Sequence, residues 1–275
     1  MQAGENFDRI ALTMRTVGEI MNRKEDYIAV FDSGVGGISV LRHLLRLMPG
    51  ERYLYLGDSA NAPYGSRTTS EVRQLSLNVA EKLMAEGVKA LVVACNTATA
   101  AAIETLRQAY PDTIVIGIEP ALKPAADRFP GGRIAVLATE VTLREQKFSR
   151  LMQHYAGNCQ VIPIPAPGLV ELIEAGHTDD SHTEALLRPL LGQYAGELDA
   201  VVLGCTHYPF AAKAITRILG ENTVLFDGGS GTARETKRRL EAAGLLRDGE
   251  GSVTLRSSLP DPKILSLSQA LLELD

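Results

Sequence analysis

Two cysteines stand in matching local sequences and could together do chemistry at a carbon atom. Cys95 follows the apolar residues 91–93, and Cys205 follows the apolar residues 201–203. A thiolate can remove a proton and a thiol can return one. Two such groups on opposite faces of one small acid would therefore invert its stereocentre. The sequence favours racemase or epimerase chemistry that needs no cofactor, with the two sulfur atoms exchanging roles in the reverse direction.

Helper groups are needed, because a free thiol has a pKa of about 8.5 and a helix N-terminus lowers it by roughly one unit at best. His207 stands two residues after Cys205 and could relay a proton or hold the charge of the thiol. Asp32 ends another apolar run, where it either caps a helix or orients a neighbouring thiol. Cys159 lies in a polar turn, shares none of these features, and is treated as incidental.

The elements that must position these residues alternate between strand-like and helical patterns, which predicts parallel sheets built from βαβ units. Apolar runs at 27–31, 53–57, 91–93 and 113–118 are expected to be strands. Ala-rich residues 98–109 are expected to form a helix with Asn96 or Thr97 as its N-cap. Cys95 would then lie between a buried strand and a helix N-terminus, where open α/β sheets bind ligands and a thiolate is favoured.

The same order of runs recurs further along the chain at 133–139, 159–165, 200–205 and 223–229, with nearly the same separations. We therefore expect an α/β fold of two similar, mainly parallel domains related by pseudo-twofold symmetry, with the active site in the cleft between them. The first domain is predicted to be 27–118 plus 229–275, and the second 119–228. Residues 1–26 are predicted to be an N-terminal extension, with apolar residues at helical spacing.

Composition narrows the classes of function. The 275 residues carry 28 Lys and Arg against 33 Asp and Glu, a formal net charge of -5 that gives no general attraction to nucleic acid. No apolar run approaches the ~18 residues that a membrane span needs. Three cysteines without a close pair argue against a disulfide scaffold and a structural zinc site, and no metal ligand set is predicted.

The loop Asp32-Ser33-Gly34-Val35-Gly36-Gly37 offers an alternative function, because Gly-rich turns that lead into helices can hold phosphate. The dinucleotide pattern GxGxxG fails here, since Ser39 stands where its last glycine belongs. We expect the glycines to let backbone N–H groups approach a small anion, with Ser33 as a hydroxyl donor.

Five stretches taken together identify a resemblance: VFDSGVGG, DSANAPYGSR, VVACNTATA, VVLGCTHYP and DGGSGTA. Over about residues 27–234 the chain resembles the glutamate racemases of the aspartate/glutamate racemase superfamily, which are independent of pyridoxal phosphate. The resemblance implies that Cys95 and Cys205 are the catalytic acid and base, assisted by Asp32 and His207. It also implies that Glu171, in PGLVELIE, supports the second thiol. The implied substrate contacts are Asp32, Ser33, Tyr64, Gly65, Asn96, Thr97, Thr206 and His207.

The resemblance further implies a cytoplasmic enzyme that needs no cofactor and interconverts L- and D-glutamate to supply D-glutamate for peptidoglycan, hence for cell-wall biogenesis and cell shape. A UDP-muramoyl-alanine precursor is an implied activator, because residues 1–26 and the stretch VLATEVTLRE look closer to the activated members. Neither nucleic acid nor a membrane is expected as a partner, and a homodimer stays open.

Three rival functions remain on sequence grounds. A racemase for aspartate or a hydantoin-like substrate would use the same paired thiols. A small-acid binding module of the periplasmic type would also have two α/β lobes. The missing export signal and the paired thiols argue against this function. A pyridoxal-phosphate enzyme would need a Lys at the strand ends that form the site, where the sequence has none.

Overall fold

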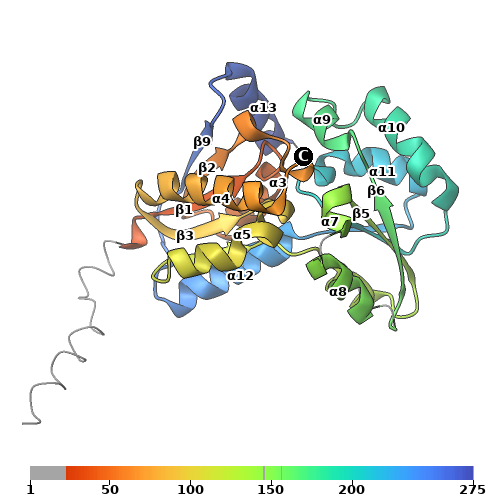
Figure 1. Ribbon diagram of the computed structural model, residues 1–275, viewed down its shortest axis with the longest axis horizontal. Helices are drawn as coiled ribbons and strands as arrows, with labels where there is room; N and C mark the ends of the chain where they lie inside the picture. The colour runs from red at the N-terminus through yellow and green to blue at the C-terminus, as the bar shows by residue number, and fades with distance from the viewer. Residues whose placement is uncertain (1–22, 145, 156, 275) are drawn as a thin grey trace, which may run out of the picture.

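A computed structural model of the chain describes residues 23–144, 146–155 and 157–274. The two halves of this structure lie side by side, each built on one parallel sheet (Figure 1). The first sheet has the order β4-β3-β1-β2-β9 and the second has the order β6-β5-β7-β8. Read from its other edge, the second sheet repeats the order of the first four strands along the chain. The prediction of two similar, mainly parallel α/β units is confirmed.

The strands of the first sheet are β1 (Tyr27–Asp32), β2 (Arg52–Gly57), β3 (Val88–Val93), β4 (Ile114–Gly117) and β9 (Ser252–Ser257). The helices of this half are α3 (Ile38–Leu47), α4 (Thr69–Met84), α5 (Asn96–Ala109), α12 (Gly229–Ala242) and α13 (Pro262–Glu273). Successive β1 side chains alternate between two cores, as strand geometry requires. Ile28 and Val30 belong to the core that includes α3, while Ala29 and Phe31 belong to the core under α4 and α5.

The second sheet contains β5 (Arg133–Ala138), β6 (Gln160–Pro165), β7 (Ala200–Leu203) and β8 (Val224–Asp227). Its helices are α6 (Leu122–Arg128), α7 (Glu140–Arg144), α8 (Gln146–Tyr155), α9 (Leu169–Glu174), α10 (Ser181–Leu191) and α11 (Ala212–Leu219). The expected amphipathic helix in residues 1–26 falls almost wholly outside the described residues.

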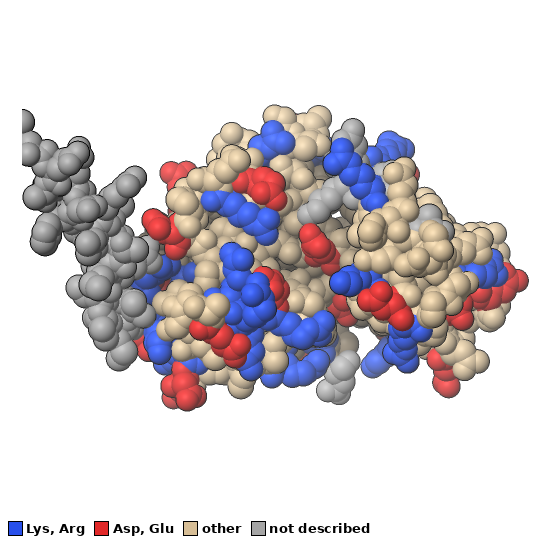
Figure 2. Space-filling view, turned by 90° about the horizontal axis from the view of Figure 1, so that it is seen from below, with Lys and Arg blue, Asp and Glu red and all other residues tan. Residues whose placement is uncertain are grey.

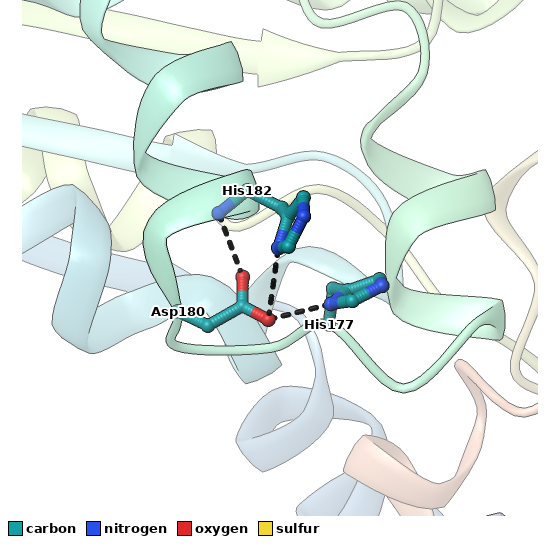
Figure 3. A group of neighbouring side chains, drawn as sticks. All are labelled: His177, Asp180 and His182. Carbon is teal, nitrogen blue, oxygen red and sulfur yellow. Dashed lines mark hydrogen bonds and ion pairs between the residues drawn. The ribbon is translucent and has the colours of Figure 1, made fainter.

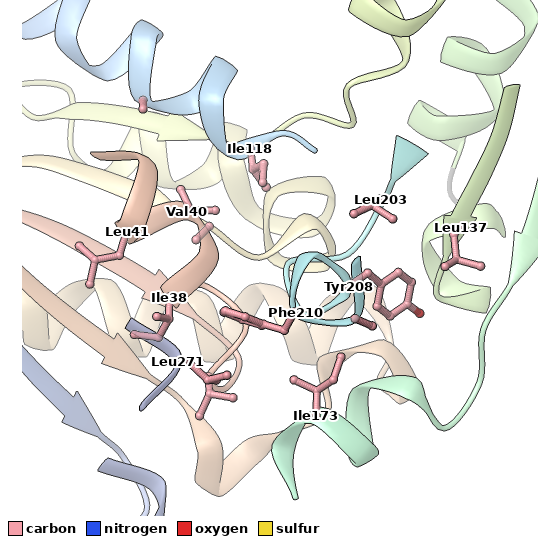
Figure 4. Packing of buried hydrophobic residues seen from close by; sticks show 14 of the residues in the cluster. Ile38, Val40, Leu41, Ile118, Leu137, Ile173, Leu203, Tyr208, Phe210 and Leu271 are labelled. Carbon is pink, nitrogen blue, oxygen red and sulfur yellow. The ribbon is translucent and has the colours of Figure 1, made fainter. Parts of the chain in front are cut away.

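One hydrophobic core joins the two halves. Ile38 and Leu41 come from α3, Leu137 comes from β5, and Tyr208 and Phe210 lie between them (Figure 4). Tyr208 is fully buried, and its hydroxyl donates a hydrogen bond to the carbonyl oxygen of Ala166 at 3.2 Å. The short turn that follows Cys205 is therefore fixed by packing from both sheets, which limits how far the two halves can move apart at this point.

The surface of the described residues carries charges of both signs. Seen from below, Lys and Arg side chains gather in places with Asp and Glu among them (Figure 2). Among the described helices, none combines the length and the apolar character that crossing a bilayer demands.

Candidate active site

Both predicted thiols face one cavity of about 400 Å³ between the two halves. Its first-half walls follow β1, β2 and β3, and its second-half walls follow β5, β6 and β7, so that carboxyl ends of strands from both sheets surround it. Ligands bind at such ends in open α/β sheets. The sequence-predicted residues that line the cavity are Ser33, Tyr64, Gly65, Cys95, Asn96, Thr97, Glu171, Cys205, Thr206 and His207.

Cys95 is itself the N-cap of α5, which corrects the expectation that Asn96 or Thr97 caps this helix. Its Sγ accepts a hydrogen bond from the backbone N–H of Ala98 at 3.5 Å and donates one to Ser33 Oγ at 3.7 Å. A thiol therefore occupies the place of the usual cap oxygen.

The expected lowering of the Cys95 pKa is wrong for this structure. Burial raises the pKa of the thiol to about 12, and the nearby charge of Asp32 adds to the rise. Hydrogen bonds that the Ala98 N–H and the Ser33 hydroxyl can donate to the thiolate oppose this shift without cancelling it. The partial positive charge at the helix N-terminus does not lower the pKa enough to offset burial, because the free energy of removing a thiolate from water exceeds the stabilisation that this partial charge provides.

Asp32 lies directly behind the cavity wall and is fully buried. One carboxylate oxygen accepts hydrogen bonds from Gly34 N at 2.9 Å and Ser33 Oγ at 3.4 Å, and the other accepts from Thr206 Oγ1 at 2.9 Å. It does not cap α3, whose N-cap is Gly37. Burial raises the pKa of Asp32. Asp32 thus orients one hydroxyl beside each cysteine, reaching Cys95 through Ser33.

His207 lies between the second thiol and a carboxylate. Its Nδ1 is 3.7 Å from Cys205 Sγ, and its Nε2 is 2.7 Å from Glu174 Oε1. Burial works against a charged imidazole, but the hydrogen bonds with Cys205 and Glu174 outweigh it and raise the pKa of His207 well above its ordinary value. Burial likewise works to raise the pKa of Glu174, and the hydrogen bond and charge of His207 lower it overall.

Sequence reasoning did not single out Glu174. It named Glu171, which the resemblance implied as support for the second thiol, and that role stays a prediction. Both lie on α9, one helical turn apart, and Glu171 lines the cavity. The hydrogen bond to His207, however, is made by Glu174, which also accepts one from Val35 N at 2.8 Å. Two carboxylates three residues apart give the same signal in the sequence, so only the direction of each side chain in the fold separates them.

The glycines of the loop after β1 make room for this pair. A Cβ at Gly34 would collide with the Glu174 carboxylate, and one at Gly36 would collide with the imidazole of His207. The close approach that glycine permits is therefore used here by side chains of the opposite half. Whether the loop also holds a small anion stays a prediction.

The remaining predicted contacts surround the two thiols. Tyr64 is 1% exposed and donates a hydrogen bond to Asp58 Oδ2 at 2.7 Å, so its phenol is fixed in the wall. Within the described residues, Asn96 Oδ1 is buried without a hydrogen-bond partner. Such an acceptor is costly unless a ligand supplies the donor. Thr139, Glu140 and Arg144 extend the lining beyond the predicted set.

Comparison with known proteins agrees with this geometry. Residues 30–236 match the family model described as Asp/Glu/Hydantoin racemase. The chain belongs to the Asp/Glu/Hydantoin racemase family. It is thus a racemase, an isomerase, and this family match spans both cysteines.

Individual members of the family are similar over nearly their whole length. A glutamate racemase of Clostridium perfringens is 49% identical over 250 residues, which cover 90% of this chain and 96% of that protein. The crystal structure of a Thermus thermophilus glutamate racemase in complex with β-chloro-D-alanine is 36% identical, with a TM-score of 0.76 and coverage of 91% and 94%. That of the Escherichia coli glutamate racemase, in complex with L-glutamate and the activator UDP-MurNAc-Ala, is 31% identical, with a TM-score of 0.77 and coverage of 90% and 95%.

Proposed function

We propose that the protein interconverts L- and D-glutamate by proton transfer at Cα between Cys95 and Cys205, without a cofactor. The observation that carries this proposal is that the two thiols line one cavity from opposite halves of the molecule. Glutamate as substrate is favoured by the glutamate racemase relatives, one of which is 49% identical. One thiolate takes the Cα proton, and the opposite thiol delivers its own proton to the other face of the planar carbanion.

The raised pKa of Cys95 sets a requirement on this mechanism. A thiol with a pKa of about 12 gives up its proton at neutral pH only at a cost of roughly 7 kcal/mol, since one pKa unit corresponds to about 1.4 kcal/mol. The ammonium group of a bound amino acid would offset part of this cost by placing a positive charge beside the sulfur. Asn96 Oδ1 is available to accept a hydrogen bond from that ammonium group.

The two thiols have different helpers. Cys95 acts with Ser33 and, through it, Asp32, while Cys205 acts with His207 and, through it, Glu174. Asp32 and Glu174 are thus positioning residues in this proposal. Hydroxyl and backbone N–H groups at the strand ends would hold the substrate carboxylates, with Thr97 and Thr206 among them. Glu171 would support the Cys205 side from the cavity wall.

The test is racemisation of each enantiomer in D₂O, with no added cofactor, by the wild type and the Cys95→Ala and Cys205→Ala variants. We expect either variant to lose racemisation by about 10³-fold or more, as removal of one member of a concerted unit does. We also expect Cys95→Ser and Cys205→Ser to exchange the Cα hydrogen of opposite enantiomers at residual rates. Racemisation by either alanine variant at the wild-type rate would refute the two-base mechanism.

Substrate choice is tested by comparing kcat/KM for glutamate, aspartate and hydantoins. We expect glutamate to be preferred. A preference for aspartate would contradict the proposed substrate and indicate an aspartate racemase of the same family. An absorbance band from a protein-bound Schiff base would instead favour pyridoxal-phosphate chemistry.

The cellular role follows from this activity. We propose that the enzyme supplies D-glutamate for peptidoglycan in the cytoplasm, and that a UDP-muramoyl-alanine precursor activates it. The support for activation is the Escherichia coli relative solved with UDP-MurNAc-Ala. Measurement of the racemisation rate at increasing concentrations of that precursor tests this proposal. A rate that does not change with precursor concentration would contradict the proposed activation. A homodimer stays a prediction.

We propose the domain boundaries predicted from the sequence, with 27–118 plus 229–275 as one domain and 119–228 as the other. Gly228 supports them, because a Cβ there would collide with Glu119 O, so the two connections between the halves lie against each other. The α12 and α13 helices after the second connection pack against α3 of the first half. Adjacent connections of this kind would let the cavity open and close about one edge.

A further inference from the structure

Two histidines and one aspartate converge where the loop after α9 meets the first turn of α10, apart from the lining of the cavity described above. His177 Nδ1 is 2.5 Å from Asp180 Oδ2, and His182 Nδ1 is 3.6 Å from the same oxygen (Figure 3). One atom from each of the three side chains lies within 4.8 Å of the other two. One carboxylate oxygen therefore faces two imidazole nitrogens.

The backbone holds these side chains in place. Asp180 is the N-cap of α10, and its Oδ1 accepts hydrogen bonds from His182 N at 3.0 Å and Thr183 N at 3.1 Å. The hydroxyl of Thr183 donates to His177 O at 2.9 Å. Since Oδ1 accepts the capping hydrogen bonds, Oδ2 can bind a second partner without loss of the cap. The three side chains are already close together in the folded protein, so binding an ion would cost little conformational entropy.

The nearby positive charge is balanced. Arg217 of α11 lies 2.7 Å from Asp179 Oδ1 and 3.5 Å from Glu184 Oε2, both of which flank the cluster in sequence. The guanidinium is therefore paired with carboxylates of its own. Glu184 also pairs with Arg188, so these two arginines and two carboxylates balance in charge, and among the ion pairs of the described residues neither arginine pairs with Asp180.

We propose that His177, Asp180 and His182 bind one divalent transition-metal ion of the Zn²⁺, Co²⁺ or Ni²⁺ class. Two imidazole nitrogens and one carboxylate oxygen are a donor set that these ions accept. Metal bonds of about 2.0–2.2 Å in tetrahedral geometry place donor atoms about 3.3 Å apart. The His182–Asp180 distance is already close to this value, and the His177–Asp180 pair has to open by less than about 1 Å.

The site is partly exposed, so the remaining coordination positions open to solvent. A bound ion would join the loop after α9 to the first turn of α10 and so brace the helix that presents Glu174. The metal site is separate from the racemase cavity, because none of the three ligands lines that cavity. We expect metal binding to raise the melting temperature of the protein, since the ion binds the folded chain.

The experiment is titration of the full-length protein, free of any histidine tag, with Co²⁺, followed by visible absorption and calorimetry. We expect one equivalent to bind with ligand-field bands and without an intense thiolate-to-cobalt band in the near ultraviolet. His177→Gln and His182→Gln should each weaken binding by about tenfold or more, as removal of a ligand in a three-ligand site requires. Asp180→Asn should do the same while keeping the helix cap, because Asn caps helices as well as Asp.

His154→Gln is the matched control, because this exposed histidine lies on α8, outside the cluster, and its loss should leave Co²⁺ binding unchanged. Failure of the wild type to bind Co²⁺ would overturn the proposal. So would unchanged binding by the His177→Gln/His182→Gln double variant. A thiolate-to-cobalt band that disappears in Cys205→Ser would also overturn it, because the ion would then lie in the cavity.

Discussion

Glu174 links two parts of the active site through a single carboxylate. It pairs with His207 and accepts the backbone N–H of Val35, so one oxygen fixes both the imidazole and the loop after β1. The charge of this carboxylate also raises the pKa of His207. In the proposed mechanism, Glu174 therefore acts by position and charge through His207.

Glu174→Gln should therefore lower kcat by about 100-fold, the effect that a small displacement of a catalytic group can have. It should also lower the pKa of His207, because the paired negative charge is lost. The high-pH limb of the kcat/KM profile should move to lower pH in the variant. The pH profile and an NMR titration of His207 measure this, and a loss of rate with an unmoved profile would contradict the electrostatic role.

Glu171→Gln is the matched control for that experiment, because it changes a carboxylate on the same helix that lines the cavity but has no hydrogen bond to His207 among those of the described residues. We expect the pKa of His207 to stay near the wild-type value in this variant. A shift as large as that of Glu174→Gln would contradict the assignment of this electrostatic role to Glu174.

At single residues, the sequence predicted the placement of the two cysteines, His207 and Thr206 because each comes shortly after an apolar strand. It failed where a distant partner decides the outcome. The pKa of Cys95 depends on burial and on Asp32, which lies in another βα unit. Glu174 and Glu171 differ only in the direction of their side chains, and the sequence carries no signal for that.

Among the elements, the apolar strands were predicted from their composition, but β9 was missed. Its residues are half-buried or exposed, and among the described strands β2 is its one partner, at the edge of the first sheet. Val253 and Leu255 are its only large apolar residues with Ser, Thr and Arg between them. Such a short alternation is a weak signal, because an edge strand has to bury only one face.

The inner strand β3 carries a buried ion pair that the sequence did not indicate. Lys89 Nζ lies 2.6 Å from Glu51 Oε2, both side chains are 0% exposed, and the ammonium also donates to the carbonyl oxygens of Lys24 and Leu245. Burial lowers the pKa of Lys89 against the effect of Glu51. The pair joins β3 to the start of β2 and to the chain after α12.

Lys89→Met should destabilise the fold by about 3–5 kcal/mol, because it leaves the Glu51 carboxylate buried without its counter-ion. The double variant Lys89→Met/Glu51→Gln should recover part of this loss, since Gln keeps an acceptor for Arg247 N. Urea unfolding measures both variants. Lys82→Met, on the exposed face of α4, is the control and should change stability by less than about 0.5 kcal/mol. Equal stability of the single and double variants would contradict the buried-charge argument.

For the whole molecule, the repeated order of apolar runs predicted the architecture, because both sheets use the same strand order. The contacts between the halves could not be predicted in the same way. Thr206 donates to Asp32, Ser39 donates to the carbonyl oxygen of Thr206, and Val35 donates to Glu174. Each joins residues far apart in the chain. Two of them involve Thr206, and the third involves Glu174, which contacts His207; Thr206 and His207 both line the cavity, so the halves are joined beside the active site.

This arrangement predicts how the stability of the whole molecule depends on pH. Glu174 has a lowered pKa, so its contribution is present above about 4.5 and is lost as the pH falls through its folded value. His207 has a raised pKa, so its contribution is present below about 6.5 and is lost as the pH rises through its folded value. The pair should therefore stabilise the protein most between about pH 4.5 and 6.5.

Urea unfolding of the wild type and Glu174→Gln across pH 3–10 tests this window. We expect the variant to be less stable by roughly 1.5–3 kcal/mol inside the window, the range for hydrogen bonds to charged groups. The difference should shrink toward both ends of the pH range, because either partner then loses its charge in the wild type. The free energy of unfolding of Glu171→Gln should differ from that of the wild type by a constant amount across this pH range. A difference that stays constant from pH 3 to pH 10 would mean that Glu174 contributes packing alone, and the two halves would then be joined at the cavity by neutral hydrogen bonds.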